Sequence, residues 1–219
     1  MSILLTGGMG YLGSHTAVSL SELGYEVVLY DNLSNSDEGV LLNLRRVIKQ
    51  GLSFVQGDVR DTHLLTKVLK NHGIKAVIHF AGLKSVKESV DHPLDYYACN
   101  VQGTLSVVAA MQLANIYTLI FSSSATVYGE PVYLPFDEKH RTCAVNTYGR
   151  TKLHAEQMLQ DLAESDPMWG VVCLRYFNPI GAHVSGLIGE SPNGVPDNLM
   201  PYVCQVAAGH QPDLKVFGK

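Results

Sequence analysis

A phenol and an ammonium group stand four residues apart in the segment Tyr148-Gly-Arg-Thr-Lys152, and this spacing places both on one face of a helix. A tyrosine with a pKa of about 10 is a poor base at pH 7, and lowering its pKa by about three units takes about 4 kcal/mol. One ammonium at ~4 Å contributes about that much at an effective dielectric constant near 20. The pair is therefore predicted to form a general base, Tyr148, whose pKa is lowered by Lys152.

Three consecutive serines, Ser122, Ser123 and Ser124, end a predicted strand, and a hydroxyl there could bridge a substrate oxygen and Tyr148. Two less specific interpretations stay open. The Y-x-x-x-K spacing is common by chance, and a serine run can be a polar loop that satisfies its own backbone.

A glycine-rich turn, Gly8-x-Gly10-x-x-Gly13, follows the first predicted strand and opens the first predicted helix. In this context the first glycines let the backbone approach a pyrophosphate, and Gly13 lets the helix pack close to the strand. Free N–H groups and the helix dipole then hold the anion. An ordinary glycine turn is the alternative, and the strand–turn–helix context argues against it.

Two carboxylates end the next two predicted strands. Asp31 can accept hydrogen bonds from the adenosine ribose hydroxyls and would repel a 2′-phosphate, although it could also be a simple turn residue. NAD is favoured over NADP because no arginine or lysine lies between Asp31 and Ser36. Asp58 can reach the adenine amino group, and the small residues in Phe80-Ala81-Gly82 let the backbone pass close to a dinucleotide.

Strand and helix patterns alternate along the chain, which predicts an α/β fold with a doubly wound parallel (Rossmann) sheet. Near-continuous apolar runs, typical of strands covered on both faces, predict strands at 2–6, 26–30, 53–56, 76–80, 118–122 and 171–175. Helical spacing recurs at Gly13, Ala17, Leu20 and Leu23, at Leu64, Val68 and Leu69, at Val101, Leu105, Val108 and Met111, and at Ala155, Leu159 and Leu162. Ligands bind such sheets at the carboxyl ends of the strands.

The amino-acid composition of the chain changes after Asn178. A stretch rich in glycine and proline, 179–201, predicts a long loop, and an amphipathic helix is predicted at 199–208. The final residues, 214–219, resemble the start of a strand. We therefore expect an NAD-binding domain at 1–178 and part of a smaller C-terminal substrate-binding subdomain at 179–219.

Composition excludes several classes of protein. Apolar residues make up 46% and charged residues 16%, which fits a globular chain, and a net charge of −4 argues against nucleic-acid binding. No apolar run reaches the ~18 residues of a membrane helix, and the N-terminus lacks a signal peptide. Four cysteines without a C-x-x-C motif predict reduced thiols in the cytoplasm, and nine histidines without ligand spacing predict no metal site.

Taken together, these motifs resemble the extended short-chain dehydrogenase/reductase family, and within it the sugar-nucleotide 4-epimerases. The resemblance spans the whole chain in family order. It is carried by Thr6-Gly-Gly-Met-Gly-Tyr-Leu-Gly-Ser-His15, His79-Phe-Ala-Gly-Leu-Lys84, Phe121-Ser-Ser-Ser-Ala-Thr-Val-Tyr-Gly129, Tyr148-Gly-Arg-Thr-Lys152, Arg175-Tyr-Phe-Asn-Pro-Ile-Gly181 and Asn198-Leu-Met-Pro201.

The resemblance implies NAD-dependent inversion at C4 of a UDP-hexose, interconverting UDP-glucose and UDP-galactose through a 4-keto sugar. Tyr148 is then the general base, Lys152 lowers its pKa and holds the nicotinamide ribose, and Ser124 bridges the proton. The resemblance places NAD contacts at Gly7, Gly10, Tyr11, Leu12, Gly13, Asp31, Asn32, Asn35, Ser36, Asp58, Val59, Phe80, Ala81, Gly82, Lys84, Asn100, Ser122, Tyr148, Lys152 and Phe177. It places UDP-sugar contacts at Ser124, Tyr148, Asn178, Asn198, Leu199, Lys215, Val216 and Phe217.

The resemblance also implies a homodimer, in which the helices near 94–114 and 151–163 pair across a two-fold axis. Departures from the family pattern occur at Cys99, where some members have a cofactor-contacting asparagine, and at Thr147, where proline is usual. Family members continue past Lys219 into a part whose arginines hold the diphosphate. We therefore expect this chain to retain NAD binding and to bind UDP-galactose weakly.

Three alternatives concern the reaction, the activity of the chain and the identity of the sugar. A nucleotide-sugar 4,6-dehydratase shares the fold and the Tyr/Lys pair, but it needs an acid after the threonine of the serine/threonine strand end, where Thr126 is followed by Val127. An inactive NAD-binding fragment or sensor is the non-enzyme alternative. The choice among a hexose, an N-acetylhexosamine and a pentose is not decided by these residues.

Overall fold

The computed structural model describes residues 1–49, 51–191 and 198–214. Within them a six-stranded parallel sheet has the order β3-β2-β1-β4-β5-β6. Its strands are β1 (Ser2–Thr6), β2 (Glu26–Asp31), β3 (Leu52–Gln56), β4 (Ile74–His79), β5 (Thr118–Ser124) and β6 (Gly170–Tyr176). The predicted doubly wound parallel sheet is confirmed, with strand ends shifted by a few residues; Phe80, for example, follows β4 instead of ending it.

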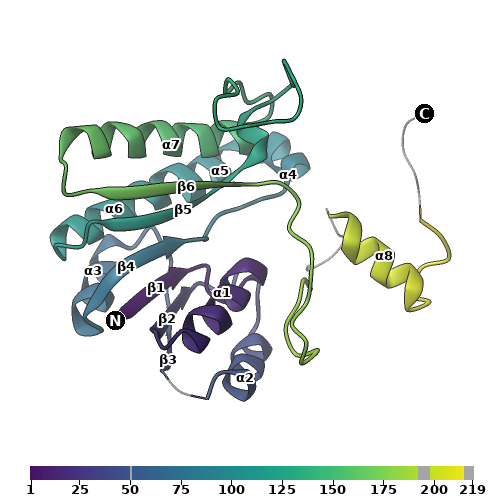
Figure 1. Cartoon of the computed structure of the whole chain (residues 1–219), viewed down its shortest axis with the longest axis horizontal. Coiled ribbons are helices and arrows are strands. Elements are labelled where there is room, and N and C mark those ends of the chain that lie inside the picture. Colours follow the sequence, from purple (N-terminus) through teal and green to yellow (C-terminus); the bar gives the residue numbers. More distant parts are fainter. Residues whose placement is uncertain (50, 192–197, 215–219) are drawn as a thin grey trace.

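Helices cover both faces of the sheet (Figure 1). They are α1 (Tyr11–Glu22), α2 (Glu38–Val47), α3 (Thr62–Asn71), α4 (Val86–Asp91), α5 (Pro93–Tyr96), the π-helix η1 (Tyr97–Gln102), α6 (Gly103–Leu113), the short 3₁₀ turn η2 (Ala125–Val127), α7 (Thr147–Ser165) and α8 (Leu199–Ala207). One apolar core joins the sheet to α3, α6 and α7, and a second joins the opposite face to α1 and α2.

Side-chain alternation along the strands explains the two cores. In β1, Leu4 enters the core with α3, α6 and α7, whereas its neighbours Ile3 and Leu5 enter the core with α1 and α2. Successive residues of a strand point to opposite faces, so a strand buried on both faces must be apolar throughout. All five residues of β1 are buried accordingly.

Two parts of the helical pattern differ from expectation. Leu105 of α6 and Leu23 at the end of α1 share the periodicity of core residues, yet both side chains are exposed. Periodicity alone cannot tell a buried stripe from an apolar stripe that faces outward. The helices α2 and α4 were not predicted, because they are short or carry few core residues; α2 buries only Leu44. The helix expected near 94–114 is present as α5, η1 and α6 in succession.

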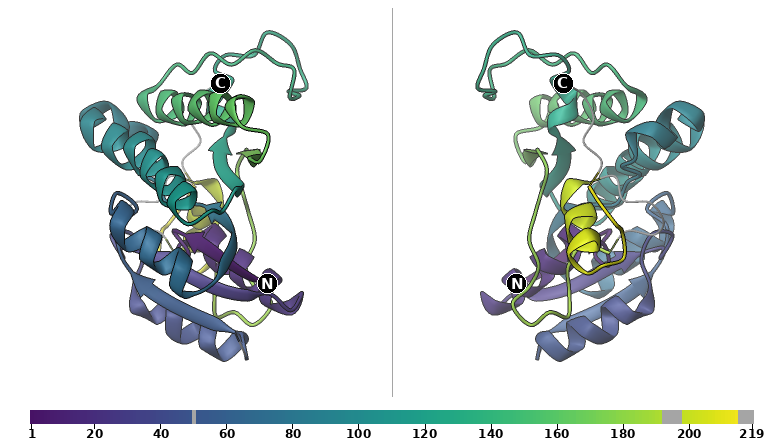
Figure 2. Two further views of the ribbon diagram at one scale, coloured as in Figure 1. Left: turned by 90° about the vertical axis from the view of Figure 1, so that its left-hand side faces the viewer. Right: turned by 90° about the vertical axis from the view of Figure 1, so that its right-hand side faces the viewer.

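The segment after β6 returns across the carboxyl edge of the sheet towards α1 and α2 (Figures 1 and 2). The Tyr11 hydroxyl donates to the Gly181 carbonyl at 2.8 Å, and Asn43 Nδ2 donates to the Leu187 carbonyl at 2.9 Å. Ile188 is buried in the core beneath α1 and α2. Helix α8 follows, and it confirms the helix predicted near 199–208.

A stability prediction follows from the packing of α1 against the glycine turn. A Cβ on Gly13 would lie 2.3 Å from the Gly7 carbonyl oxygen and 2.7 Å from the Gly8 Cα, so Gly13→Ala must displace backbone. We expect the free energy of unfolding to fall by about 1–3 kcal/mol, measured by urea denaturation.

The matched control is Gly170→Ala at the start of β6, where the nearest atom to a new Cβ is the Tyr117 carbonyl oxygen at 3.9 Å. This control is expected to unfold within about 0.5 kcal/mol of the unsubstituted chain. Equal stabilities for the two variants would show that α1 does not depend on the missing Cβ of Gly13.

Candidate active site

The glycine turn brings the end of β1 against the segment that follows β4. Gly7 has a φ of +66°, and a Cβ on it would lie 2.6 Å from the Ala81 backbone nitrogen. The Phe80 and Ala81 amides both donate to the Thr6 carbonyl, at 3.0 and 3.1 Å. Helix α1 begins directly after Gly10, so the unpaired amides of its first turn face the same edge of the sheet. This arrangement fits a pyrophosphate at the point where the strand order reverses.

The Asp31 carboxylate lies next to this turn, at the end of β2. Its Oδ2 accepts from the Met9 amide at 3.0 Å, and its Oδ1 accepts from the Leu33 amide at 2.9 Å and from the Ser36 hydroxyl at 3.3 Å. These donors orient the carboxylate, and Oδ2, which accepts a single hydrogen bond, has capacity for a further donor. Asn32 and Asn35 lie exposed in the same loop.

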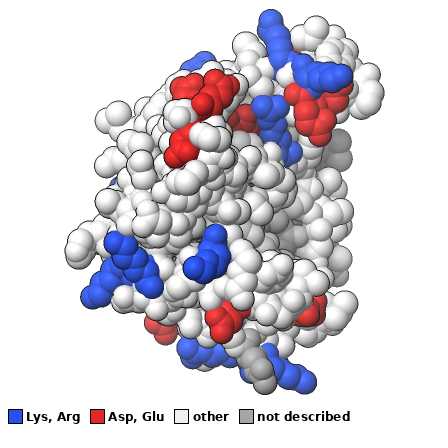
Figure 3. All heavy atoms as spheres, turned by 60° about the vertical axis from the view of Figure 1, so that its left-hand side comes forward, with Lys and Arg blue, Asp and Glu red and all other residues white. Residues whose placement is uncertain are grey.

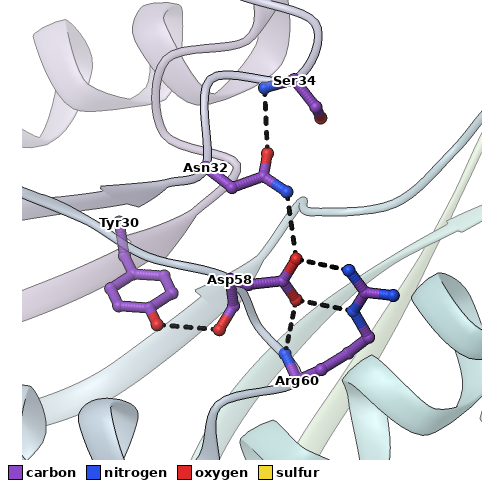
Figure 4. Close-up of polar contacts among 5 residues, drawn as sticks. All are labelled: Tyr30, Asn32, Ser34, Asp58 and Arg60. Carbon is purple, nitrogen blue, oxygen red and sulfur yellow. Dashed lines mark hydrogen bonds and ion pairs between the residues drawn. The ribbon is translucent and has the colours of Figure 1, made fainter.

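Asp58 is more fully engaged than the sequence indicated (Figure 4). Its Oδ1 accepts from the Arg60 amide and Nε, and its Oδ2 accepts from Arg60 Nη2 at 2.7 Å and Asn32 Nδ2 at 3.2 Å. The hydrogen bonds from Arg60 hold the pKa of this carboxyl group well below its usual range. The backbone carbonyl of Asp58 accepts from the Tyr30 hydroxyl at 2.8 Å. An adenine amino group at Asp58 would therefore have to share an oxygen with Arg60 or Asn32.

Asn100 ties the segment after β4 to α7. Its Oδ1 accepts from the Leu83 amide at 2.8 Å, and its Nδ2 donates to the Leu83 carbonyl and the Thr151 hydroxyl, both at 3.0 Å. The side chain is buried and belongs to the π-helix η1. Such single-turn π-helices are frequent at functional sites.

Lys152 lies inside the protein, with 4% of the residue exposed. Its Nζ donates to the Ser122 carbonyl at 2.8 Å and lies 5.0 Å from the centroid of the Phe121 ring. Burial lowers the pKa of Lys152 to about 8, and the charges of Cys99 and Glu156 oppose that decrease. The ammonium group therefore titrates close to physiological pH.

The structure adds the effect of burial to the expectation for Tyr148. Burial raises the pKa of Tyr148 above its usual value, and the opposing hydrogen bond with Ser124 is the smaller effect. The sequence argument balanced an attraction to Lys152 against the ordinary pKa of tyrosine and omitted the desolvation of the phenol. In the chain without cofactor, burial of the phenol therefore outweighs this hydrogen bond, and the lowering of the Tyr148 pKa by Lys152 stays a prediction.

Ser124 lies where β5 ends and η2 begins. Its hydroxyl oxygen accepts from the Thr126 amide at 3.2 Å and from the Thr126 hydroxyl at 2.9 Å, and it is also hydrogen-bonded to Tyr148. The serine thus caps a turn and contacts the phenol at the same time. The turn-forming interpretation of the serine run holds at this position, and the role of Ser124 as a bridge to the substrate stays a prediction.

The remaining residues expected in the site are Lys84, the residues that follow β6, and the residues around the start of α8. Lys84 Nζ lies 3.4 Å from Glu190 Oε1, and Asn198 Nδ2 donates to the same oxygen. Exposed positions after β6 and at the start of α8 hold Phe177, Asn178 and Leu199. Lys215, Val216 and Phe217 lie outside the described residues.

Three polar clusters were missed by the sequence analysis. His79 bridges the hydroxyls of Thr6 and Thr104, at 2.6 and 3.1 Å, and burial lowers its pKa to about 3. Glu190 joins Lys84 to Asn198, and a lone acid in a glycine-rich loop gives no sequence signal.

The third missed cluster pairs Glu156 with Arg175, whose Nη2 lies 2.7 Å from Oε2. Glu156 stands four residues after Lys152, so extending the Tyr148–Lys152 spacing by one turn would have found it.

The described residues contain neither a metal-binding cluster nor a membrane-spanning helix. No cluster of three or more histidine, cysteine or acidic side chains that could hold a metal ion occurs among them. None of their helices is long and apolar enough to cross a membrane.

Comparison with known proteins identifies close relatives. A family model described as GDP-mannose 4,6 dehydratase matches residues 4–219. The UDP-glucose 4-epimerase of Neisseria gonorrhoeae is 52% identical over 219 residues, which cover 100% of this chain and 65% of that protein.

Two solved structures share the fold closely. UDP-glucose 4-epimerase from Stenotrophomonas maltophila, with bound NAD and formylated UDP-arabinopyranose, has a TM-score of 0.97 and 50% identity, covering 100% of this chain and 65% of that one. The Bifidobacterium longum enzyme, in complex with NAD⁺ and UDP, has a TM-score of 0.95 and 45% identity, with the same coverage of 100% and 65%.

The chain spans about 65% of the length of the first relatives it matches. The resemblance that the motifs indicated is confirmed, since relatives at about half identity over the whole chain are UDP-glucose 4-epimerases. Because the family model covers nearly every residue, the chain belongs to the family that the GDP-mannose 4,6 dehydratase model describes.

Proposed function

We propose that this chain binds NAD and takes part in the inversion of C4 of a UDP-hexose, interconverting UDP-glucose and UDP-galactose. One observation carries the proposal. Tyr148, Ser124 and the buried Lys152 lie together at the edge of the sheet that also holds the glycine turn. The relatives from S. maltophila and B. longum hold NAD and uridine nucleotides in their crystals, which supports the proposal.

The residues at this edge fit a dinucleotide. The amides at the start of α1 would hold the pyrophosphate, the Asp31 carboxylate would accept from the adenosine ribose, and Lys152 would reach the nicotinamide ribose. Gly7 leaves room where a Cβ would collide with the Ala81 backbone. When bound, NAD supplies an acceptor for the hydride at C4 and can return it to the opposite face.

The chain's own groups handle the proton. Tyr148 takes the proton of the 4-hydroxyl, directly or through the hydroxyl of Ser124, and returns it when the 4-keto sugar is reduced. Lys152 lies inside the protein as an ammonium and favours the phenolate by its charge. We assign to the UDP-sugar the exposed Asn178 and Leu199 and the partly buried Asn198, together with Lys215, Val216 and Phe217.

Dehydration is the alternative that the description of the family model suggests. Elimination of water across C5–C6 needs an acid near the sugar ring, and Thr126 of η2, just after β5, is followed by Val127 and Tyr128. Epimerisation needs no such acid. The second alternative, an NAD-binding chain without turnover, predicts NAD affinity but no conversion of UDP-galactose.

We also propose that the NAD-binding domain comprises residues 1–178 and that 179–219 belong to a substrate-binding subdomain. The position of α8 beside the sheet supports this division, although Ile188 of the segment after β6 packs in the core beneath α1 and α2. All four cysteines are free, which favours a reducing compartment such as the cytoplasm.

A homodimer is a further part of the proposal. Leu94, Leu105 and Leu113 are exposed on α5 and α6, at 81%, 54% and 59%. Charged side chains are scattered over the face shown in Figure 3 and leave a broad uncharged area. Apolar helix surfaces of this kind pair in isologous dimers.

Sedimentation velocity tests the dimer. We expect the chain to sediment as a dimer at micromolar concentration and Leu105→Glu to sediment as a monomer, because the charge would be buried at the two-fold contact. Leu23→Glu, at an exposed leucine after α1, is the control and should remain dimeric. A monomeric unsubstituted chain would contradict the proposal.

Cofactor preference tests the role of Asp31. NAD should bind at least about tenfold more tightly than NADP, because the carboxylate faces the 2′ position. Asp31→Ser should narrow this ratio, whereas Asp37→Asn, which caps α2 from the same loop, should leave it unchanged. Equal calorimetric affinities for NAD and NADP in the unsubstituted chain would remove Asp31 from the adenosine site.

Turnover tests the role of Tyr148. With NAD and UDP-galactose supplied, Tyr148→Phe should form UDP-glucose roughly 10²–10⁴-fold more slowly, because a general base is lost. NAD affinity should barely change. Tyr25→Phe, just before β2 at the opposite edge of the sheet, is the matched control and should retain the rate. A Tyr148→Phe variant that turns over as fast as Tyr25→Phe would refute the assignment, and a chain that binds NAD without any turnover would favour the non-enzyme alternative.

A further inference from the structure

The face of α7 that carries Tyr148 and Lys152 continues one turn further to Glu156. Residues four apart on a helix lie above one another, so the three side chains form one stripe. Glu156 is 8% exposed, and it has no part in the function proposed above. A carboxylate so deeply buried beside two candidate catalytic groups calls for a physical explanation.

The Glu156 carboxylate is held from two strands. Arg175 of β6 donates Nε to Oε1 at 3.0 Å and Nη2 to Oε2 at 2.7 Å. Ser123 of β5 donates its hydroxyl to Oε1. The guanidinium carbon of Arg175 lies 4.9 Å from the centroid of the Tyr128 ring, which follows η2. The cluster therefore joins α7 to β5, to β6 and to the turn after β5.

Ser123 stands between the two strand residues that contact the candidate catalytic groups. The carbonyl of Ser122 accepts from Lys152, and the hydroxyl of Ser124 bonds to Tyr148. Three successive residues of β5 thus each meet one member of the α7 stripe. Fixing the middle contact helps to fix the other two, because the pairing of β5 with β6 holds the backbone of these three residues in place.

We propose that Glu156 is a positioning residue for the Tyr148–Lys152 pair, which clamps Ser123 to α7 and keeps the Lys152 ammonium charged. The inference rests on the proposed function insofar as that charge serves NAD binding. The contacts themselves do not depend on it.

The charged and titratable groups that face Lys152 support this role. They are Glu156 and Tyr148 on α7, Cys99 on η1 and His79 on β4. Burial raises the pKa of the Cys99 thiol and lowers the pKa of His79 to about 3, so both are neutral at pH 7. Glu156, which is paired with Arg175 of β6, is then the group among these whose charge favours the ammonium form of Lys152.

An NMR titration of the 219-residue chain tests the proposal. With ¹³Cε-labelled lysine and the Lys152 signal assigned by Lys152→Met, the unsubstituted chain should titrate near the pKa of about 8 expected for Lys152. Glu156→Gln removes a facing negative charge, which disfavours the ammonium, so the midpoint should fall by at least about half a pH unit. NAD affinity at pH 8 should fall about twofold in parallel, because the charged fraction of Lys152 falls from about one half to about one quarter.

Leu159→Val is the matched control, because it loosens the packing of the same helix and leaves the polar contacts in place. It should not move the Lys152 midpoint. If Glu156→Gln does not fold, the double variant Glu156→Gln with Arg175→Gln leaves no unpaired buried charge and should lower the midpoint in the same direction.

An unchanged midpoint in the folded Glu156 variants, or an equal shift in Leu159→Val, would overturn the inference. Its failure is distinguishable from failure of the proposed function. A chain that does not bind NAD contradicts the function, whereas the titration of Lys152 is read without any NAD present.

Discussion

Burial of the Lys152 ammonium is the constraint on which the rest of the site depends. A charged amine inside a protein must find oxygen partners, and the partner here is the Ser122 carbonyl at 2.8 Å. The pairing of β5 with β4 ends at Phe121, so Ser122 lies just beyond it, although β5 still pairs with β6 through Ser124. The hydrogen bond from Lys152 holds the first turns of α7 at the carboxyl end of β5, which brings Tyr148 to the edge that also carries the glycine turn.

The order of the strands explains how distant segments reach this edge. All six described strands are parallel, so the loops that follow β1, β2, β3, β4 and β5 leave on the same side. The strand order reverses between β1 and β4, and Gly7 allows the two loops to touch there. Hydrogen bonds then link neighbouring loops in series: Asp31 to the glycine turn, Asn32 to Asp58, and Asn100 to α7.

The features that could be predicted from the sequence are those that depend on residues close together along the chain. Apolar runs gave the six strands, and the glycine turn, Asp31 and the Tyr148–Lys152 spacing lie on the elements expected of them. Sequence reasoning could not find Arg60 on Asp58 or Glu190 between Lys84 and Asn198, because those contacts depend on how loops fold back in space. It also omitted the effect of burial on the pKa of Tyr148, since the cost of burying a phenol depends on packing that no spacing reveals.

Burial shifts the pKa values of the two candidate catalytic residues, Tyr148 and Lys152, in opposite directions. It raises the pKa of Tyr148 and lowers the pKa of Lys152 to about 8, so both shifts favour the neutral forms. A phenolate–ammonium pair is then favoured only where more hydrogen-bond donors or more positive charge face the phenol. Ser124 supplies one donor, and the positive nicotinamide ring of NAD⁺ would supply charge. The base is therefore expected to be weak in the chain alone and strong only when the site is filled, which ties proton removal to the presence of the hydride acceptor.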